Sequence, residues 1–311
     1  MSGDMDSWPE LKWSDWQPTA DTLHMWTQIV GKTRLGLTPL QNHWWNVPLY
    51  VSARGLTTSP MPLPGRTGVV EIEFDFIAHL LHLRLSAGEA LALPLHAQPV
   101  AAFFAEYELA LASLGIDVKI NPMPVEVRNP VRFDLDTTNA SYDPDAVARF
   151  HRVLMNADTV FKRFSTGFQG KISPVHFFWG SFDLCVTRFS GRRAVGPPRP
   201  DKVQAEAYSH EVISCGFWPG NGGFGAAAFY CYAAPVPEGL AENPVHPGAW
   251  NSALGEFLLD YEEARGAPAP AATVLDFLES TYSAAADAAK WDRAALDRPF
   301  NRPLNRKPAG T

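Results

Sequence analysis

The sequence predicts an α+β protein built from two diverged, pseudo-symmetric halves, each an antiparallel sheet flanked by helices. Three observations lead to this fold class: helical apolar patterns flank each half, period-two patterns lie between them, and similar motifs recur in the same order in both halves. Turn residues leave only short gaps between neighbouring strand patterns. Such gaps favour antiparallel pairing over long crossover connections.

Four segments carry apolar residues at the alternating spacings of three and four that are typical of a helix with one buried face. The clearest runs from Pro144 to Phe168, with Asp143 as its N-cap and Gly170 as its stop signal. We expect the other helices at residues 22–30, 99–114 and 273–289.

Alternating apolar residues indicate strands that bury one face. In the first half these patterns lie at residues 47–53, 70–76 and 81–85. In the second half they lie at residues 182–188, 226–234 and 256–261.

The two halves share an order of motifs that predicts an internal duplication. Each has a helix, a Gly-Lys pair, a histidine followed by aromatic residues, and an arginine at the far end of the next strand. The matching residues are His43 and Arg54 in the first half and His176 and Arg188 in the second. A two-fold arrangement brings matching segments together near its axis, so we expect His43 and His176 to face a shared cleft.

The same comparison predicts the domain organisation. We expect an N-terminal extension (1–18), a first half (19–118), a connector rich in Pro and Asn (119–142), a second half (143–292) and a mobile tail (293–311).

Composition indicates an ordinary globular protein, with 46% hydrophobic and 19% charged residues. The sequence has neither a run of about 18 apolar residues nor a basic, then apolar, N-terminus, so we expect no membrane insertion and no secretion. Cys185, Cys215 and Cys231 lack a paired spacing, which favours buried free thiols in a reducing cytoplasm. The net charge of −7 argues against nucleic acid as a partner.

Five long segments resemble a known family. They are WPEL from Trp8, TLHMWTQIVGK from Thr22, NHWWNVPLYVSARGLTTSP from Asn42, SPVHFFWGSFDLCVTRFSGR from Ser173 and YSHEVISCGFWPG from Tyr208. In these segments the chain resembles an uncharacterised bacterial family, domain of unknown function 5996, over nearly its whole length outside the tail. The resemblance implies no activity, cofactor or catalytic residue.

The two matched histidines, His43 and His176, are the first candidates for chemistry. Each begins an aromatic run, where the simplest interpretation is a core histidine whose ring nitrogens are hydrogen-bonded to the backbone. A pair of imidazoles at a cleft could instead bind a metal or exchange protons. The sequence does not identify a metal or a cofactor.

His210 and Glu211 are adjacent candidates in an apolar segment. Neighbouring residues of a strand point to opposite faces, so only one of the two can enter a given pocket unless a bulge intervenes. A carboxylate in apolar surroundings has a raised pKa suited to general acid or base catalysis. An inter-strand ion pair is the structural alternative for Glu211, and Asp183 is the second candidate carboxylate.

Ligand-binding candidates lie beside these residues. Arg54 and Arg188 could clamp a carboxylate or phosphate group, or form ordinary surface ion pairs. Trp44, Trp179 and Trp218 offer flat surfaces to a ring-containing ligand, although filling the core is their default role.

The sequence lacks the HExxH, GxSxG and GxGxxG motifs, which excludes the common zinc-protease, α/β-hydrolase and dinucleotide patterns. We therefore expect a small-molecule enzyme with a histidine, arginine and carboxylate site between the halves. A non-catalytic module that binds or senses an aromatic or acidic metabolite is the alternative, followed by a structural or partner-binding role. The oligomeric state is not predicted.

Overall fold

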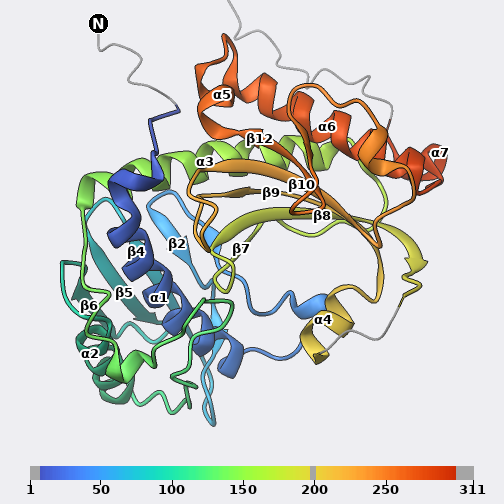
Figure 1. Cartoon of the computed structure of the whole chain (residues 1–311). Coiled ribbons are helices and arrows are strands. Elements are labelled where there is room, and N and C mark those ends of the chain that lie inside the picture. Colours follow the sequence, from blue (N-terminus) through green and yellow to red (C-terminus); the bar gives the residue numbers. More distant parts are fainter. Residues whose placement is uncertain (1–7, 197–200, 299–311) are drawn as a thin grey trace, which may run out of the picture.

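The computed structural model describes residues 8–196 and 201–298 and contains two antiparallel sheets with helices packed against them (Figure 1). This arrangement confirms the α+β class. The helices are α1 (Trp13–Leu37), α2 (Val100–Ser113), α3 (Pro144–Thr166), α4 (Lys202–Ala207), α5 (Tyr261–Gly266), α6 (Pro270–Ala288) and α7 (Arg293–Leu296).

The first sheet has the strand order β1-β2-β4-β5-β6, with β3 paired to β4. Its strands are β1 (Tyr50–Val51), β2 (Gly55–Thr57), β3 (Met61–Pro62), β4 (Val69–Asp75), β5 (Leu80–Leu85) and β6 (Ala90–Pro94).

The second sheet has the order β11-β12-β10-β9-β8-β7. Its strands are β7 (His176–Phe178), β8 (Asp183–Arg193), β9 (His210–Trp218), β10 (Ala228–Ala234), β11 (Ala249–Asn251) and β12 (Glu256–Asp260). Helices α3 and α6 pack against the same face of this sheet, where the apolar residues of β8, β9 and β10 lie.

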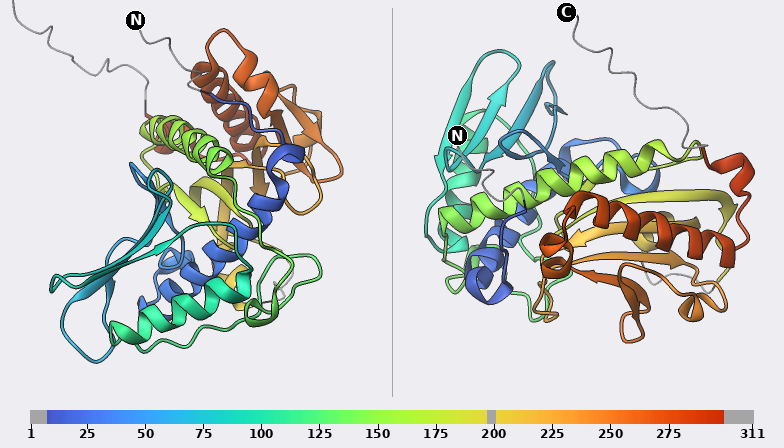
Figure 2. Two further views of the ribbon diagram at one scale, coloured as in Figure 1. Left: turned by 90° about the vertical axis from the view of Figure 1, so that its left-hand side faces the viewer. Right: turned by 90° about the horizontal axis from the view of Figure 1, so that it is seen from above.

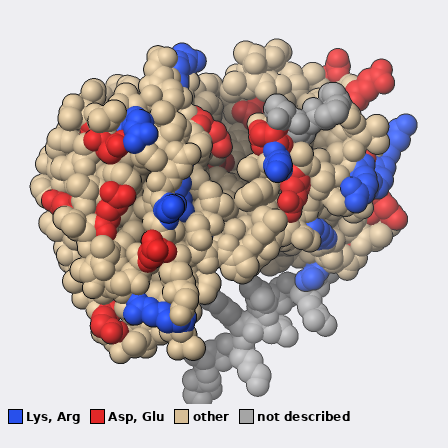
Figure 3. Space-filling view, turned by 90° about the horizontal axis from the view of Figure 1, so that it is seen from below, with Lys and Arg blue, Asp and Glu red and all other residues tan. Residues whose placement is uncertain are grey.

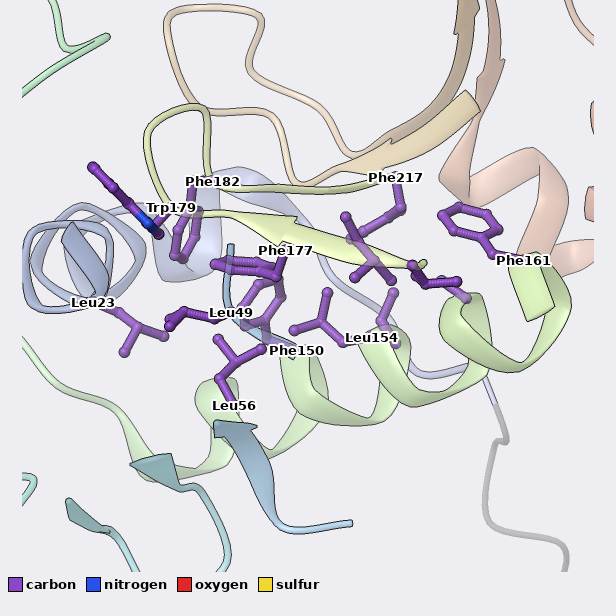
Figure 4. Close-up of a cluster of buried hydrophobic side chains, with 14 of the residues drawn as sticks. Leu23, Leu49, Leu56, Phe150, Leu154, Phe161, Phe177, Trp179, Phe182 and Phe217 are labelled. Carbon is purple, nitrogen blue, oxygen red and sulfur yellow. The ribbon is translucent and has the colours of Figure 1, made fainter. Parts of the chain in front are cut away.

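Helix α3 runs along both sheets and links their cores (Figure 2). Its start agrees with the sequence, because Asp143 accepts hydrogen bonds from the backbone of Asp145 and Ala146. Phe150, near its N-terminus, packs against Phe177 at the junction of the two sheets, with ring centroids 6.4 Å apart. Phe161, within the last two turns of α3, contacts the second sheet, and the buried apolar residues around both sheets form one continuous cluster (Figure 4).

The sheets meet at a single antiparallel bridge between Leu49 and Phe177. Each residue donates its backbone N–H to the carbonyl of the other at 2.9 Å. Both side chains are fully buried and point toward α3 (Figure 4). The strand expected at residues 47–53 is therefore reduced to Tyr50–Val51, with Leu49 serving as the link to β7.

The first helix is much longer than its apolar pattern indicates. It begins at Trp13, within the expected N-terminal extension, and passes through Pro18. Burial explains the difference, because Trp16 packs against Phe150 with ring centroids 4.9 Å apart and Trp8 contacts Phe229 of the second sheet. Tertiary packing outweighs the helix-breaking preference of an internal proline.

The expected tail also begins in ordered structure. Residues Arg293–Leu296 form α7, and Asp297 makes a bridge with Phe168 and an ion pair with Arg293 at 2.8 Å. The rest of that tail, from residue 299, lies outside the described residues.

Two expectations from composition can be compared with the structure. Cys185, Cys215 and Cys231 are buried free thiols, as predicted. Within residues 8–196 and 201–298, the structure contains no helix that is long and apolar enough to cross a bilayer.

The junction core should dominate stability. We expect Phe177→Ala to lower the free energy of unfolding by about 3–5 kcal/mol, because it opens a cavity where both sheets meet α3. Leu109→Ala, on the exposed side of α2, is the matched control and should change it by less than about 0.5 kcal/mol. Urea unfolding followed by circular dichroism measures both, and equal losses would contradict this view of the junction.

Candidate functional site

One row of residues crosses the junction on the face opposite α3. Tyr50 follows Leu49, and His176 precedes Phe177. Their side chains therefore lie together on the face opposite α3, with ring centroids 5.6 Å apart. The register continues the row from His176 to Cys185, Gly216 and Tyr230. We call this surface of the joined sheets the junction face.

The junction face carries polar side chains where the α3 face is apolar. Its residues on the second sheet include Asp183, Cys185 and Thr187 on β8, Ser214 and Gly216 on β9, Tyr230 and Tyr232 on β10, and Glu256 on β12. Figure 3 shows the molecule from below, with a hollow between its two lobes and acidic side chains nearby.

Asp183 is the most constrained carboxylate of this face. It is 7% exposed and accepts hydrogen bonds from the hydroxyls of Ser181 and Tyr230. Burial raises the pKa of Asp183, and the two hydrogen bonds only partly offset that rise. Asp183 therefore retains a proton at higher pH than an exposed carboxyl group does.

Gly216 makes the contact between Tyr230 and Asp183 possible. It lies on β9 between β8 and β10 in the register, and a Cβ added to it would overlap Cζ of Tyr230. The tyrosine ring occupies the space that a side chain on β9 would fill, and from there its hydroxyl reaches Asp183.

The charge of Asp183 raises the pKa of two further carboxylates. The pKa of Glu256 is raised to about 7, mainly by burial and then by the charge of Asp183. The pKa of Glu126, in the connector, is raised by burial and then by the charges of Asp183 and Asp201. Although much of the surface of Glu126 is exposed, its carboxylate lies against Gly180. The negative charge of Asp183 therefore disfavours ionisation of both Glu256 and Glu126.

Tyrosines extend this network toward α4. The hydroxyls of Tyr208 and Tyr232 are 2.9 Å apart, and the rings of Tyr230 and Tyr232 stack at 6.0 Å. Burial raises the pKa of both Tyr230 and Tyr232 well above the ordinary value. Both therefore remain protonated hydrogen-bond donors at neutral pH.

His43 and His210 come together near α4, with ring centroids 5.8 Å apart. Nδ1 of His43 faces the backbone carbonyl of Glu206 at 3.1 Å, which assigns the proton to Nδ1. Nε2 then accepts a hydrogen bond from Lys171 Nζ at 2.7 Å. Burial, followed by the charge of Lys171, lowers the pKa of His43, so the imidazole is neutral.

His176 lies on the other side of Trp45, whose ring centroid is 5.5 Å from His43 and 5.9 Å from His176. His43 and His176 therefore share Trp45 as a neighbour, and no hydrogen bond joins them within the described residues. His176 is 1% exposed, and neither ring nitrogen has a hydrogen-bond partner among the described residues. Burial and the nearby charge of Arg34 lower its pKa to about 3.

The structure places Arg54 and Arg188, the two candidate anchors for an anionic group, on different sheets and in different surroundings. Arg54 pairs with Asp75 at 2.5 Å on the first sheet. Arg188 is buried on the α3 face, with its guanidinium 3.4 Å from the Phe164 ring centroid and 3.6 Å from Glu279. The alternation of β8 explains this, because Arg188 shares its face with apolar Val186 while Asp183 points the opposite way.

Glu211 forms an ion pair, which the sequence analysis gave as the structural alternative to a role in catalysis. Its carboxylate lies 2.6 Å from the guanidinium of Arg192. The strand alternation directs it away from the face that His210 occupies.

The tryptophans have different roles. Trp179 is buried against Gly31 of α1 and donates its Nε1–H to the carbonyl of Val47 at 2.9 Å. Trp44 is partly buried against the core. Trp218 remains near the junction face, where it stacks on Phe224 with ring centroids 4.8 Å apart.

Arg34 is the residue of this region that sequence patterns do not identify. It lies in the last turn of α1, and its guanidinium carbon is 5.4 Å from the ring centroid of Tyr50. A basic residue at a helix C-terminus is common, so the sequence gives no signal that this one is buried.

The model of a family of unknown function, DUF5996, matches residues 8–298. The chain belongs to this family. No curated protein and no solved structure matches the chain. Membership of DUF5996 confirms the expected family and assigns no chemistry. Within the described part of the chain, no group of three or more His, Cys, Asp or Glu residues is arranged to hold a metal ion.

Gly216→Ala tests the packing of the carboxylate site. The added methyl group must displace Tyr230 from Asp183, and we expect a loss of about 1–3 kcal/mol in the free energy of unfolding. Gly266→Ala is the control, because a Cβ there meets no atom within 4 Å. Denaturant unfolding measures both variants, and an unchanged Gly216→Ala protein would contradict the proposed close packing.

The buried imidazole of His176 predicts acid sensitivity. Its pKa is about 3 in the folded chain against an ordinary value of 6.5, so only the unfolded chain takes up this proton between those values. The free energy of unfolding should therefore fall as pH decreases below about 6.5, with no contribution from His176 to its pH dependence above that value. Unfolding measured across this range should show a shallower fall for His176→Gln than for the wild type, and an equal fall in the two proteins would contradict this account.

Proposed function

We propose that the chain is an enzyme that transfers protons on a small-molecule substrate at the junction face, between the two halves. The observation that carries the proposal is Asp183, a buried carboxyl group with a raised pKa beside protonated Tyr230. Groups with perturbed pKa values that converge on one face are typical of acid–base sites.

The carboxylates provide the chemistry of this proposal. A general acid or base works best when its pKa lies near the working pH, and the pKa of about 7 at Glu256 meets that condition. Asp183 sets this value in part through its charge, while Tyr230 donates a hydrogen bond that orients the Asp183 carboxylate. The His43 and His210 pair offers further proton carriers near α4.

The internal duplication is a second part of the proposal. The hairpins β1–β2 and β7–β8 meet at the Leu49–Phe177 bridge, and each follows a long helix, which supports a common origin. The buried free cysteines also support a reducing, cytoplasmic location. The net charge of −7 supports a small-molecule partner over nucleic acid.

A groove on the second sheet favours the alternative of a non-catalytic binding module. It has a volume of about 420 Å³, and Phe224, Ala228, Trp250 and Leu258 are among its lining residues. Because Ala228 and Leu258 lie on the junction face, an aromatic metabolite could bind in this groove without reacting. Tryptophan fluorescence that changes on binding without any product would favour this alternative.

Substitution of the buried carboxylate tests the enzyme proposal. The purified protein is incubated with a defined mixture of metabolites, and consumed and formed compounds are followed by mass spectrometry. Asp183→Asn and Tyr230→Phe should lower turnover by about 100-fold or more, the usual contribution of a positioned acid or base.

Glu211→Gln is the matched control, because it removes a carboxylate that forms a surface ion pair. Its turnover should equal that of the wild type. Circular dichroism checks that each variant is folded. Turnover by folded Asp183→Asn at the wild-type rate would refute the role given to Asp183.

A further inference from the structure

We propose that Arg34 and His176 form a binding site for an oxyanion, supplied by the carboxylate or phosphate group of the ligand. That this oxyanion belongs to a substrate rests on the proposed function. The anion site itself rests on the geometry of the junction.

The first argument is the buried charge of Arg34. This side chain is 7% exposed, and no carboxylate forms an ion pair with it among the described residues. One terminal nitrogen donates to the carbonyl of Thr58, and the guanidinium also has a hydrogen bond with the Tyr50 side chain, whereas Nε has no partner in the described part of the chain. Buried arginines are normally paired with an anionic group, because an uncompensated charge is costly to remove from water.

The second argument is the set of unused hydrogen-bonding groups on His176. A neutral imidazole has one N–H donor and one acceptor nitrogen, and neither has a partner among the described residues. Buried polar groups almost always have partners, so two such nitrogens on a histidine that is close enough to Arg34 to feel its charge indicate a ligand-binding position.

Tyr50 explains why these groups lie in one place. Its ring contacts the Arg34 guanidinium on one side and the His176 ring edge-on, at 5.4 Å and 5.6 Å respectively. The position of Tyr50 is fixed by the neighbouring bridge between Leu49 and Phe177. The two candidate ligand-binding side chains therefore come from distant parts of the chain and share Tyr50 as a neighbour where the sheets join.

The charge of Arg34 favours an anion over a metal ion. The same positive charge that lowers the pKa of His176 would repel a cation bound to its imidazole. An oxyanion would accept hydrogen bonds from Arg34 and His176 together. Binding would also stabilise the imidazolium form, so the pKa of His176 should rise.

The proposed oxyanion site lies close to the carboxylates. His176 pairs with Cys185, and Asp183 precedes Cys185 by two residues on the same face. Two residues span about 7 Å along a strand. A ligand of metabolite size could therefore be held through its oxyanion while another part reaches Asp183.

Anion titration of the full-length protein tests this site. Inorganic phosphate and sodium acetate are added separately at constant ionic strength, with the ring nitrogens of His176 followed by ¹⁵N NMR. We expect at least one of the two anions to shift the His176 resonances, raise its pKa and raise the melting temperature. A response to phosphate alone identifies a phosphate site, and a response to acetate identifies a carboxylate site.

Arg34→Gln should weaken the anion affinity by about tenfold or more, which corresponds to about 1.4 kcal/mol. Arg54→Gln removes an exposed arginine and should keep the wild-type affinity. If Arg34→Gln does not fold, Arg34→Lys retains the charge but loses the forked donors, and its affinity should also fall. Unchanged His176 resonances in the wild type, or equal affinities in folded Arg34 and Arg54 variants, would overturn the proposal.

The two proposals fail in different ways. Loss of turnover in Asp183→Asn without any anion response at His176 would refute the oxyanion site and retain the enzyme. An Arg34-dependent anion response without turnover would retain the site and favour a binding module.

Discussion

The bridge between Leu49 and Phe177 is the interaction on which the rest of the structure depends. Its two hydrogen bonds join sheets that would otherwise expose unpaired edges. On one face it buries both side chains under Phe150 of α3. On the other face it brings Tyr50 beside His176, which creates the polar junction between the halves.

The two faces of the junction have different physical roles. The α3 face is apolar and supplies the burial that stabilises the fold. The opposite face holds Asp183 and His176 in poorly hydrated surroundings, where the charged form of each is disfavoured. Burial of polar groups costs stability unless their hydrogen bonds are satisfied, so a face of this composition is typical of a functional site.

Strand alternation decides which predicted residues belong to the site. Asp183 and Arg188 lie on the same strand but are separated by an odd number of residues. Asp183 therefore points to the junction face, and Arg188 points to the opposite face under α6. The same rule separates His210 from Glu211. Arg34, by contrast, reaches the junction because the path of α1 places its guanidinium beside Tyr50.

The sequence by itself determined the α+β class, three helices close to their observed bounds, the free cysteines and the family. The fold class, the helices and the cysteines follow from local periodicity, capping and composition, which a single chain displays directly, whereas the family rests on the resemblance of five long motifs. Only the tertiary structure decided the length of α1, the burial of Arg34 and the meeting of Tyr50 with His176. Such features arise from contacts between residues far apart in the chain, and no local pattern encodes which distant partner a side chain will meet.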